Sequence, residues 1–191
     1  MACSKKDVPW MFRVLTASHR DCLETHERKM LSDALHASSA SCNTHLVKLL
    51  LDDGTADPAA RDSAALRSAS FHGCTGVIEL LVEDGRADPA ARKSLSLWWA
   101  GNFGYTEIAK TLLLDGRADP AAKKDSSLRS AASRGYIDVV KLLLQDGRGS
   151  TSFEKVSASF LETGHADVDK LLVSEFPQTR KRARRRTAAQ G

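Results

Sequence analysis

The feature that most constrains this chain is a phrase of eight residues that returns at a fixed distance. "DGTADPAA" begins at Asp53, and "DGRADPAA" begins at Asp84 and again at Asp115. These starting positions are evenly spaced and give a period of 31. Self-similarity at a period of about 20–50 residues is typical of stacked repeats, in which each unit buries its apolar face against its neighbours. We therefore predict a solenoid of stacked units.

The pattern of each unit predicts two helices, each followed by a glycine. The units begin near residues 35, 66, 97, 128 and 159. The first helix carries small residues, and the second, such as "TGVIELLVED", has a broad apolar face that suits burial between two neighbours. Glycine tolerates the left-handed conformation that ends many helices. We assign that role to Gly54, Gly73, Gly85, Gly104, Gly116, Gly135 and Gly147.

Polar residues recur at the joints between the predicted helices. Asp57, Asp88 and Asp119 each precede a proline, which indicates an Asx turn or a helix N-cap rather than a row of catalytic acids. A second polar column lies three residues before each aligned leucine. Because serine and aspartate are good N-caps, we predict that this column caps the first helix of each unit. Its members are Ser32, Ser63, Ser94 and Asp125.

The units resemble the ankyrin repeat over about residues 35–173. "GYIDVVKLLLQDG" and "GYTEIAKTLLLDG" look like the second helix of that family, "LRSAASRG" looks like the first, and "ADP" stands where the family usually reads A-D-V-N. The resemblance implies an all-α, ankyrin-type helical repeat solenoid. The T-P-L-H-x-A signature is reduced to "AALRSA", "LSLWWA" and "SSLRSA", and the period is shorter than the family's usual length of about 33. The missing residues fall where the family places a β-hairpin finger, so we expect shortened or absent fingers, or a helical turn in place of the hairpin.

The predicted organisation has three parts. Residues 1–31 form an N-terminal helical cap or a degenerate repeat, residues 32–176 the ankyrin-like repeats, and residues 177–191 a basic disordered tail. The chain has a net charge of +4, and the tail alone contributes +6, which leaves −2 for the rest. The cations of the tail are Arg180, Lys181, Arg182, Arg184, Arg185 and Arg186. Such a run is typical of a nuclear import signal, of a phosphate-binding patch on nucleic acid, or of a solubilising tail with no further role.

The resemblance also implies a binding surface. In ankyrin proteins the two residues before the first turn glycine of each unit line the concave, partner-binding face. Here those positions change between units whose framework is nearly copied, which fits either a role in recognition or drift on a solvated face. They are Phe71, His72, Asn102, Phe103, Ser133 and Arg134. Trp98 takes the family's histidine position and is predicted to reach the edge of the groove, whereas Trp99 is predicted to fill the core.

No motif indicates catalysis or metal binding. The chain has no G-x-S-x-G, P-loop or H-E-x-x-H sequence. His19, Cys22 and His26 would share one helix face, but a fourth zinc ligand is missing, so we predict ordinary residues of a capping helix. The four scattered cysteines are interpreted as reduced thiols, and no apolar run is long enough to cross a membrane. We therefore predict a monomeric intracellular protein, cytoplasmic or nuclear or both, with no cofactor and no enzymatic activity.

Two functions fit these patterns. The first is a non-catalytic protein–protein interaction scaffold or adaptor that binds another protein through the concave face of the repeats. The alternative is a nuclear or nucleic-acid-associated protein whose basic tail provides import or binds the phosphate backbone. The two hypotheses differ in whether the exposed aromatic residues or the tail provides the affinity.

Overall fold

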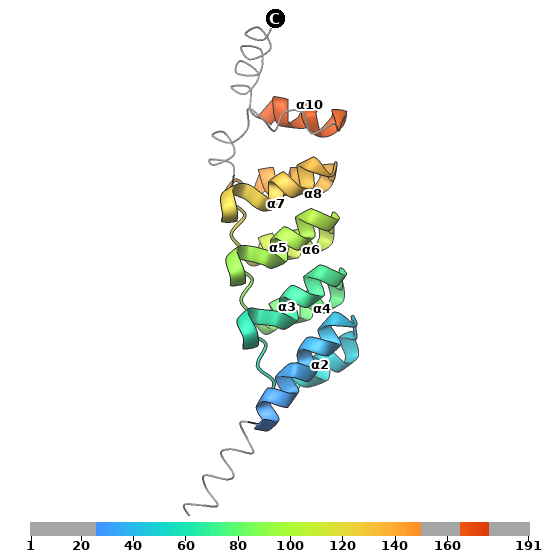
Figure 1. Cartoon of the computed structure of the whole chain (residues 1–191), viewed down its shortest axis with the longest axis vertical. Helices are drawn as coiled ribbons and strands as arrows, with labels where there is room; N and C mark the ends of the chain where they lie inside the picture. Colours follow the sequence, from blue (N-terminus) through green and yellow to red (C-terminus); the bar gives the residue numbers. More distant parts are fainter. Residues whose placement is uncertain (1–25, 150–164, 176–191) are drawn as a thin grey trace, which may run out of the picture.

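The computed structural model describes residues 26–149 and 165–175. Within these ranges the regular secondary structure consists of helices, with no strand. The helices stack as pairs along one long axis, each pair beside the next, as Figure 1 shows. The prediction of an all-α repeat solenoid with shortened or absent β-hairpin fingers is therefore confirmed over the described residues.

Each pair consists of an inner and an outer helix. A helix over residues 26–40 precedes α2 (Thr44–Asp52), and the later pairs are α3 (Ala60–His72) with α4 (Thr75–Asp84), α5 (Ala91–Phe103) with α6 (Thr106–Asp115), and α7 (Ala122–Ser133) with α8 (Ile137–Asp146). The inner helices α3, α5 and α7 contact one another in order, and so do the outer helices α2, α4, α6 and α8. Helix α10 (Ala166–Glu175) lies against α8.

The core runs the length of the stack because the same columns are buried in each unit. Leu35, Leu66 and Leu97 are fully buried, and each stands one period after the last. Each outer helix adds apolar side chains, such as Val77, Ile78 and Leu81 of α4. Burying a leucine side chain contributes about 1.5–3 kcal/mol. Since each unit buries these residues against its neighbours, the pairs are stable only as a stack.

The turn glycines have the predicted left-handed backbone. All seven have positive φ, between 74° and 81°. Gly104 shows a second reason for glycine, because a Cβ there would lie 2.6 Å from the ring of Tyr136. Gly73 meets the ring of Tyr105, one unit earlier, in the same way. The glycine that ends an inner helix thus also makes room for an aromatic ring of the next unit.

The predicted N-cap column has a different role, and that prediction was wrong. Ser63, Ser94 and Asp125 each end a left-handed turn of three residues with φ between 51° and 63°. These turns stand where the family places its hairpin. The serine hydroxyls instead accept hydrogen bonds from backbone N–H groups 25 residues later, at 2.8 Å from Asp88 N to Ser63 Oγ and 2.7 Å from Asp119 N to Ser94 Oγ. The serines of this column therefore join consecutive units.

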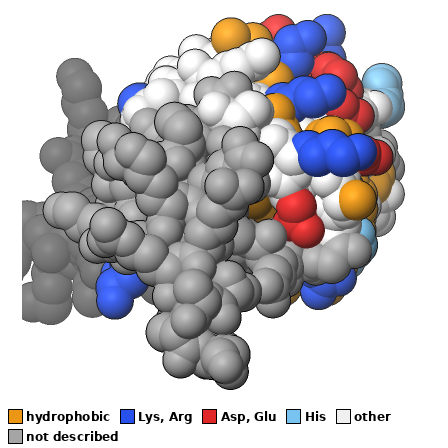
Figure 2. All heavy atoms as spheres, turned by 90° about the horizontal axis from the view of Figure 1, so that it is seen from above, with side chains coloured by type: hydrophobic (Ala, Val, Ile, Leu, Met, Phe, Trp, Pro, Cys, Tyr) orange, Lys and Arg blue, Asp and Glu red, His pale blue; other side chains and the backbone are white. Residues whose placement is uncertain are grey.

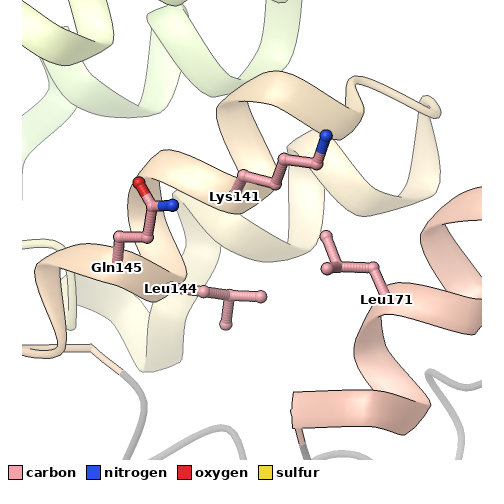
Figure 3. Close-up of a pocket in the computed structure, with 4 residues that line it drawn as sticks. All are labelled: Lys141, Leu144, Gln145 and Leu171. Carbon is pink, nitrogen blue, oxygen red and sulfur yellow. The ribbon is translucent and has the colours of Figure 1, made fainter.

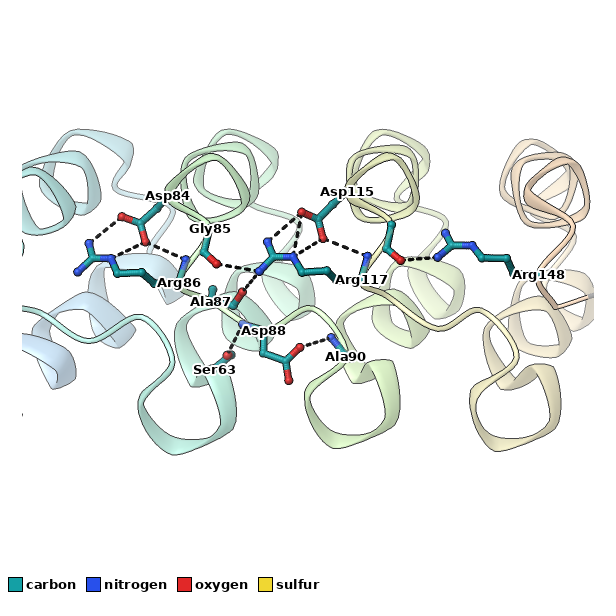
Figure 4. A network of polar contacts seen from close by, with 11 residues as sticks. Ser63, Asp84, Gly85, Arg86, Ala87, Asp88, Ala90, Asp115, Arg117 and Arg148 are labelled. Atoms are coloured by element: carbon teal, nitrogen blue, oxygen red, sulfur yellow. Dashed lines mark hydrogen bonds and ion pairs between the residues drawn. The ribbon is translucent and has the colours of Figure 1, made fainter.

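The proline-linked aspartates form the predicted Asx turns. The Oδ1 atoms of Asp57, Asp88 and Asp119 each accept a hydrogen bond of 2.9 Å from the backbone N–H two residues later. In the same phrase, the arginine reaches back into the preceding unit (Figure 4). Arg117 donates to the carbonyl oxygens of Gly85 and Ala87, both at 2.8 Å. Asp115 holds this guanidinium at 2.8–3.2 Å and raises the pKa of Arg117, so the arginine stays charged.

The same arginine joint recurs at each later phrase. Arg86 donates to the carbonyl oxygens of Leu51, Gly54 and Ala56, and Arg148 donates to those of Leu113, Gly116 and Ala118. In each case the carbonyls lie at the end of the preceding outer helix or in the turn after it, where backbone acceptors lack helical partners. The first phrase has Thr55 at the arginine position. The described residues contain no helix pair before that unit for an arginine to reach.

Two of the cysteines are bonded, which corrects the prediction of reduced thiols. Cys42 and Cys74 form a disulfide with their Cα atoms 5.0 Å apart. Cys42 lies in the turn of the first unit, with a φ of 55°, at the column that holds glycine in later units. Cys74 is the N-cap residue of α4. The bond therefore joins the first unit to the second. Cys3 and Cys22 lie outside the described residues.

Candidate functional site

Aromatic side chains gather where the inner helices of the second and third units meet. Trp99 and Phe103 are four residues apart on α5, which places them on one face of the helix. Their rings are stacked, with centroids 5.5 Å apart and planes inclined by 7°. Phe71 of α3 packs its ring edge against both, at 4.7 Å from Trp99 and 5.6 Å from Phe103. Two helices thus combine to form one aromatic surface.

Three further rings extend this surface. Trp98 contacts Trp99 at 4.5 Å, His72 contacts Phe71 at 4.9 Å, and Tyr105 contacts Phe103 at 5.6 Å between centroids. We call this set the aromatic cluster, and its members are Phe71, His72, Trp98, Trp99, Phe103 and Tyr105. Edge-to-face and offset contacts of this kind contribute about 0.5–1.5 kcal/mol per pair beyond burial. The contacts therefore hold the rings in defined positions before any partner binds.

The aromatic cluster is open to solvent. Phe71 is 42% exposed and His72 is exposed, whereas both tryptophans and Phe103 are half-buried. The sequence analysis predicted that Trp99 fills the core. Its side chain is instead half-buried and packs against Phe71. A contiguous exposed apolar surface is typical of an interaction site. Aromatic residues are also enriched at the centres of protein interfaces.

The structure separates the other predicted site residues from this cluster. Asn102 is only 7% exposed, and its Oδ1 accepts a hydrogen bond of 2.9 Å from Ser130 Oγ. It thus links α5 to α7 and does not present its amide to solvent. Ser133 and Arg134 are exposed at the end of α7. The predicted residues therefore differ in how accessible their side chains are.

A shallow pocket beside Trp98 adds residues that the sequence analysis missed. It has a volume of about 250 Å³ and lies between α5 and α7. Its lining consists of Trp98, Ser126, Arg129, Ser130 and Ser133. Arg129 stands one period after Trp98, in the same column of the repeat. That register was a usable signal, because residues of one column lie side by side on neighbouring inner helices.

The basic character of this face is a second feature. The inner-helix segments 64–72, 95–103 and 126–134 contain three arginines and no aspartate or glutamate. Arg67 donates to the backbone oxygens of Arg61 and Asp62, at 3.2 and 2.7 Å. Burial, followed by the charge of Arg92, lowers the pKa of Arg67. Elsewhere, both charge signs appear on the described surface when the stack is seen from above (Figure 2).

A second pocket lies at the last described joint of the stack. It has a volume of about 260 Å³ and is lined by Lys141, Leu144 and Gln145 of α8 and by Leu171 of α10 (Figure 3). This lining is mostly aliphatic and offers no nucleophile or acid–base pair. Across residues 26–149 and 165–175, no group of three or more histidine, cysteine or acidic side chains is placed to hold a metal ion. Within the same residues, the helices are too short or too polar to span a membrane.

Comparison with protein-family models identifies the repeat. The model of the ankyrin repeat matches residues 32–63. Residues 32–63 are therefore an ankyrin repeat. The matched segment is the first unit of the stack, and the next three helix pairs repeat its columns with the same period. A search of curated proteins found no match. Ankyrin repeats generally mediate protein–protein interactions, and the family is typically non-enzymatic.

Several predicted features of the chain lie outside the described residues. They include the basic tail, residues 180–186, together with His19 and Cys22 of the rejected metal set. The first helix of the unit near residue 159 also falls there. The three-part division of the chain therefore stays a prediction.

Proposed function

We propose that this protein is a non-catalytic interaction scaffold that binds another protein through the exposed side of its inner helices, with the aromatic cluster at the centre. We call that side the inner-helix face. The observation that supports the proposal most directly is the position of Phe71, which is 42% exposed and packed edge-on against Trp99 and Phe103. Since the framework around it is copied from unit to unit, the stack presents these rings rigidly. A rigid aromatic surface loses little conformational entropy when it binds.

The proposal assigns different roles to the predicted residues. Phe71, Trp98 and Phe103 would make the apolar contacts, and His72 would border them. Ser133 and Arg134 would contact the partner farther along the face. Asn102 would position Ser130 rather than touch the partner, because its side chain is buried. The face needs no cofactor for this role.

The experiment is affinity capture with matched variants. The full chain, a Phe71→Ala and Phe103→Ala double variant, and a Leu114→Ala variant are immobilised, and captured proteins are compared by mass spectrometry. Leu114 is the control because it is a large apolar residue, 79% exposed, on the outer helix α6. Loss of an interface hot spot costs about 2 kcal/mol or more, which is at least about a 30-fold loss of affinity. We expect the double variant to lose a partner that the Leu114→Ala variant retains.

Phe103 is half-buried, so its loss can also affect folding. The single variant Phe71→Ser changes an exposed position and serves as a second test. Circular dichroism and thermal unfolding show whether each variant keeps the stack. If folded variants at Phe71 capture the same proteins as the parent chain, binding through the aromatic cluster is refuted.

A second candidate function rests on the tail, which has six cations in the seven residues 180–186. We infer an alternative in which this segment directs nuclear import or binds the phosphate backbone. Up to six phosphate contacts would give an affinity that falls steeply with salt. Anisotropy of a labelled DNA duplex, titrated with the full chain and with a chain lacking residues 180–186, tests it. Equal binding by both chains would exclude the tail as a nucleic-acid contact, and equal nuclear accumulation of fluorescent fusions would exclude import.

A further inference from the structure

The first residue of each left-handed turn is a cation. In the first two turns it forms an ion pair with an aspartate, but at the third turn the equivalent columns hold no acid. Arg61 forms an ion pair of 2.7 Å with Asp33, and Arg92 forms one of 3.0 Å with Asp62. Each pair joins a turn to the unit before it. At the third turn the equivalent cation is Lys123. The two columns that supplied Asp33 and Asp62 hold Leu95 and Lys93 in the third unit, so neither offers Lys123 an acid.

The result is a basic cluster at the start of α5 and α7. Lys93, Lys123 and Lys124 are all exposed. We call these three residues the lysine cluster. No ion pair to any of them is found among the described residues. Since like charges repel, a cluster of this kind lowers stability slightly unless a partner neutralises it.

The lysine cluster adjoins the same face as the aromatic cluster. The contact of Arg67 shows this, because its guanidinium reaches from α3 to the backbone oxygens of Arg61 and Asp62 in the left-handed turn. Trp98 and Arg129 occupy the same column as Arg67 in the next two units. That column therefore borders the turns along the stack. The lysines lie on one side of it, and Phe71 and Phe103 lie one helical turn farther along the inner helices.

We propose that the inner-helix face binds an acidic peptide segment that carries an aromatic or large aliphatic anchor. This inference rests on the proposed function and names the chemistry of its partner. The anchor packs on Phe71 and Trp99, and the acidic residues lie against the lysine cluster and Arg129. The charge of the face argues for this partner, because the inner-helix segments carry no acid and the lysine cluster adds exposed cations beside them. Complementary charge speeds association and rejects basic partners.

A single-stranded nucleic acid is also polyanionic, but the ring geometry disfavours it. Base binding needs aromatic faces that successive bases can stack on. Trp99 and Phe103 are stacked on each other, and the contacts of Phe71 and Trp98 place ring edges against ring faces. The exposed ring of Phe71 is a single anchor site rather than a stacking platform. The observations therefore favour a peptide.

The test is selection of random linear peptides displayed on phage against the full chain. We expect the selected peptides to be enriched in aspartate and glutamate around phenylalanine, tryptophan or leucine. The tightest one is then synthesised with a fluorescent label and titrated against four proteins by anisotropy. These are the parent chain, the triple variant Lys93→Gln, Lys123→Gln and Lys124→Gln, the corresponding triple variant to glutamate, and Leu114→Ala as control.

We expect the parent to bind the peptide most tightly, the glutamine variant less tightly and the glutamate variant most weakly. Each exposed ion pair is weak, but charge reversal at three lysines replaces attraction with repulsion, so we expect about a tenfold loss of affinity. The loss should shrink at high salt. Leu114→Ala should bind as the parent does. Thermal unfolding of the glutamine variant shows that the stack is intact.

Other outcomes overturn the inference. If the selected peptides carry no acidic excess, or bind the charge-reversed chain as tightly as the parent, the acidic partner is wrong. If those peptides still lose affinity in the Phe71→Ala and Phe103→Ala variant, the proposed function survives that failure. If no peptide is enriched, both fail. If a labelled single-stranded oligonucleotide binds the parent more tightly than the best peptide and depends on the same lysines, nucleic acid replaces the peptide as the ligand.

Discussion

Asp125 gives a sharp test of how the units are joined. It stands in the column where Ser63 and Ser94 accept hydrogen bonds from the next unit, and it is only 1% exposed. Neither of its carboxylate oxygens has a hydrogen-bond partner among the described residues. Burial, followed by the charge of Asp119, raises the pKa of Asp125 to about 6, and Arg129 opposes that rise only in part. The folded chain therefore binds a proton at Asp125 more tightly than the unfolded chain does.

The sign and size of the effect follow from linkage. The pKa of Asp125 rises from an ordinary value of 3.8 to about 6 on folding. Stability that depends on the protonated carboxyl is fully present below the lower value and is lost as the pH rises through the higher one. Over that range the loss is about 3 kcal/mol. Replacing Asp125 with serine removes this penalty and restores the residue found at positions 63 and 94. We expect Asp125→Ser to stabilise the chain by about 2–3 kcal/mol more at pH 7.5 than at about pH 4.

Urea unfolding measures the difference. The free energy of unfolding of the parent and of Asp125→Ser is determined between about pH 4 and pH 8, by far-UV circular dichroism and by tryptophan fluorescence. Coincident transitions by the two probes justify a two-state treatment. Ser94→Asp is the reciprocal variant, because Ser94 is also 1% exposed, and it should introduce a new loss of stability toward neutral pH. Parallel pH profiles for the parent and Asp125→Ser would refute the reasoning, since the carboxyl would then titrate as an exposed group.

Two further predictions concern the links between units. Arg117→Lys keeps a cation beside Asp115 but removes the guanidinium group that donates to the oxygens of Gly85 and Ala87. We expect the free energy of unfolding to fall by about 1–3 kcal/mol. Urea unfolding measures it against the surface variant Lys110→Met, and equal stability would show that the carbonyls find other partners. The double variant Cys42→Ser and Cys74→Ser removes a cross-link across 32 residues, which the chain-entropy model values at about 3.7 kcal/mol. Thermal unfolding with and without reductant should separate the parent from this variant only without reductant, and an unchanged parent profile in reductant would contradict the prediction.

Much of the fold could be predicted because it depends on columns that repeat. The buried leucines and the turn glycines are local requirements, and each recurs once per period. The links between units were harder to predict, because their partners lie in different repeats. Ser63 matches a local N-cap pattern, yet its hydroxyl accepts from Asp88, which is 25 residues away. A local rule therefore gave the wrong role to a residue whose partner belongs to the next unit.

The disulfide shows which signal was overlooked. Cys42 and Cys74 are 32 residues apart, one more than the period. In a stack, that spacing places two residues in neighbouring units and in adjacent columns. The sequence analysis looked for paired cysteines within a local motif and found none. Comparison of the cysteine spacing with the period would have predicted the contact.

The geometry of the predicted site residues depends on contacts between repeats. Phe71 and Phe103 are found on one surface, as the variable columns suggested. The side chain of Asn102 turns into the joint with α7, because Ser130 offers it a hydrogen bond. Trp99 is half-buried because Phe71 of the previous unit packs edge-on against it. Such details depend on side chains one repeat apart, which differ between units while the backbone does not.

The repeated phrase has more functions than a turn. Its glycine ends the outer helix, and the aspartate before its proline closes an Asx turn, as the sequence predicted. Its arginine donates to carbonyl oxygens at and just after the end of the previous outer helix. The backbone N–H of the aspartate before proline also donates to the serine of the previous turn (Figure 4). Each copy thus satisfies polar groups of the unit before it. The phrase is nearly identical in each copy because every joint needs the same contacts, which leaves the inner-helix face free to vary.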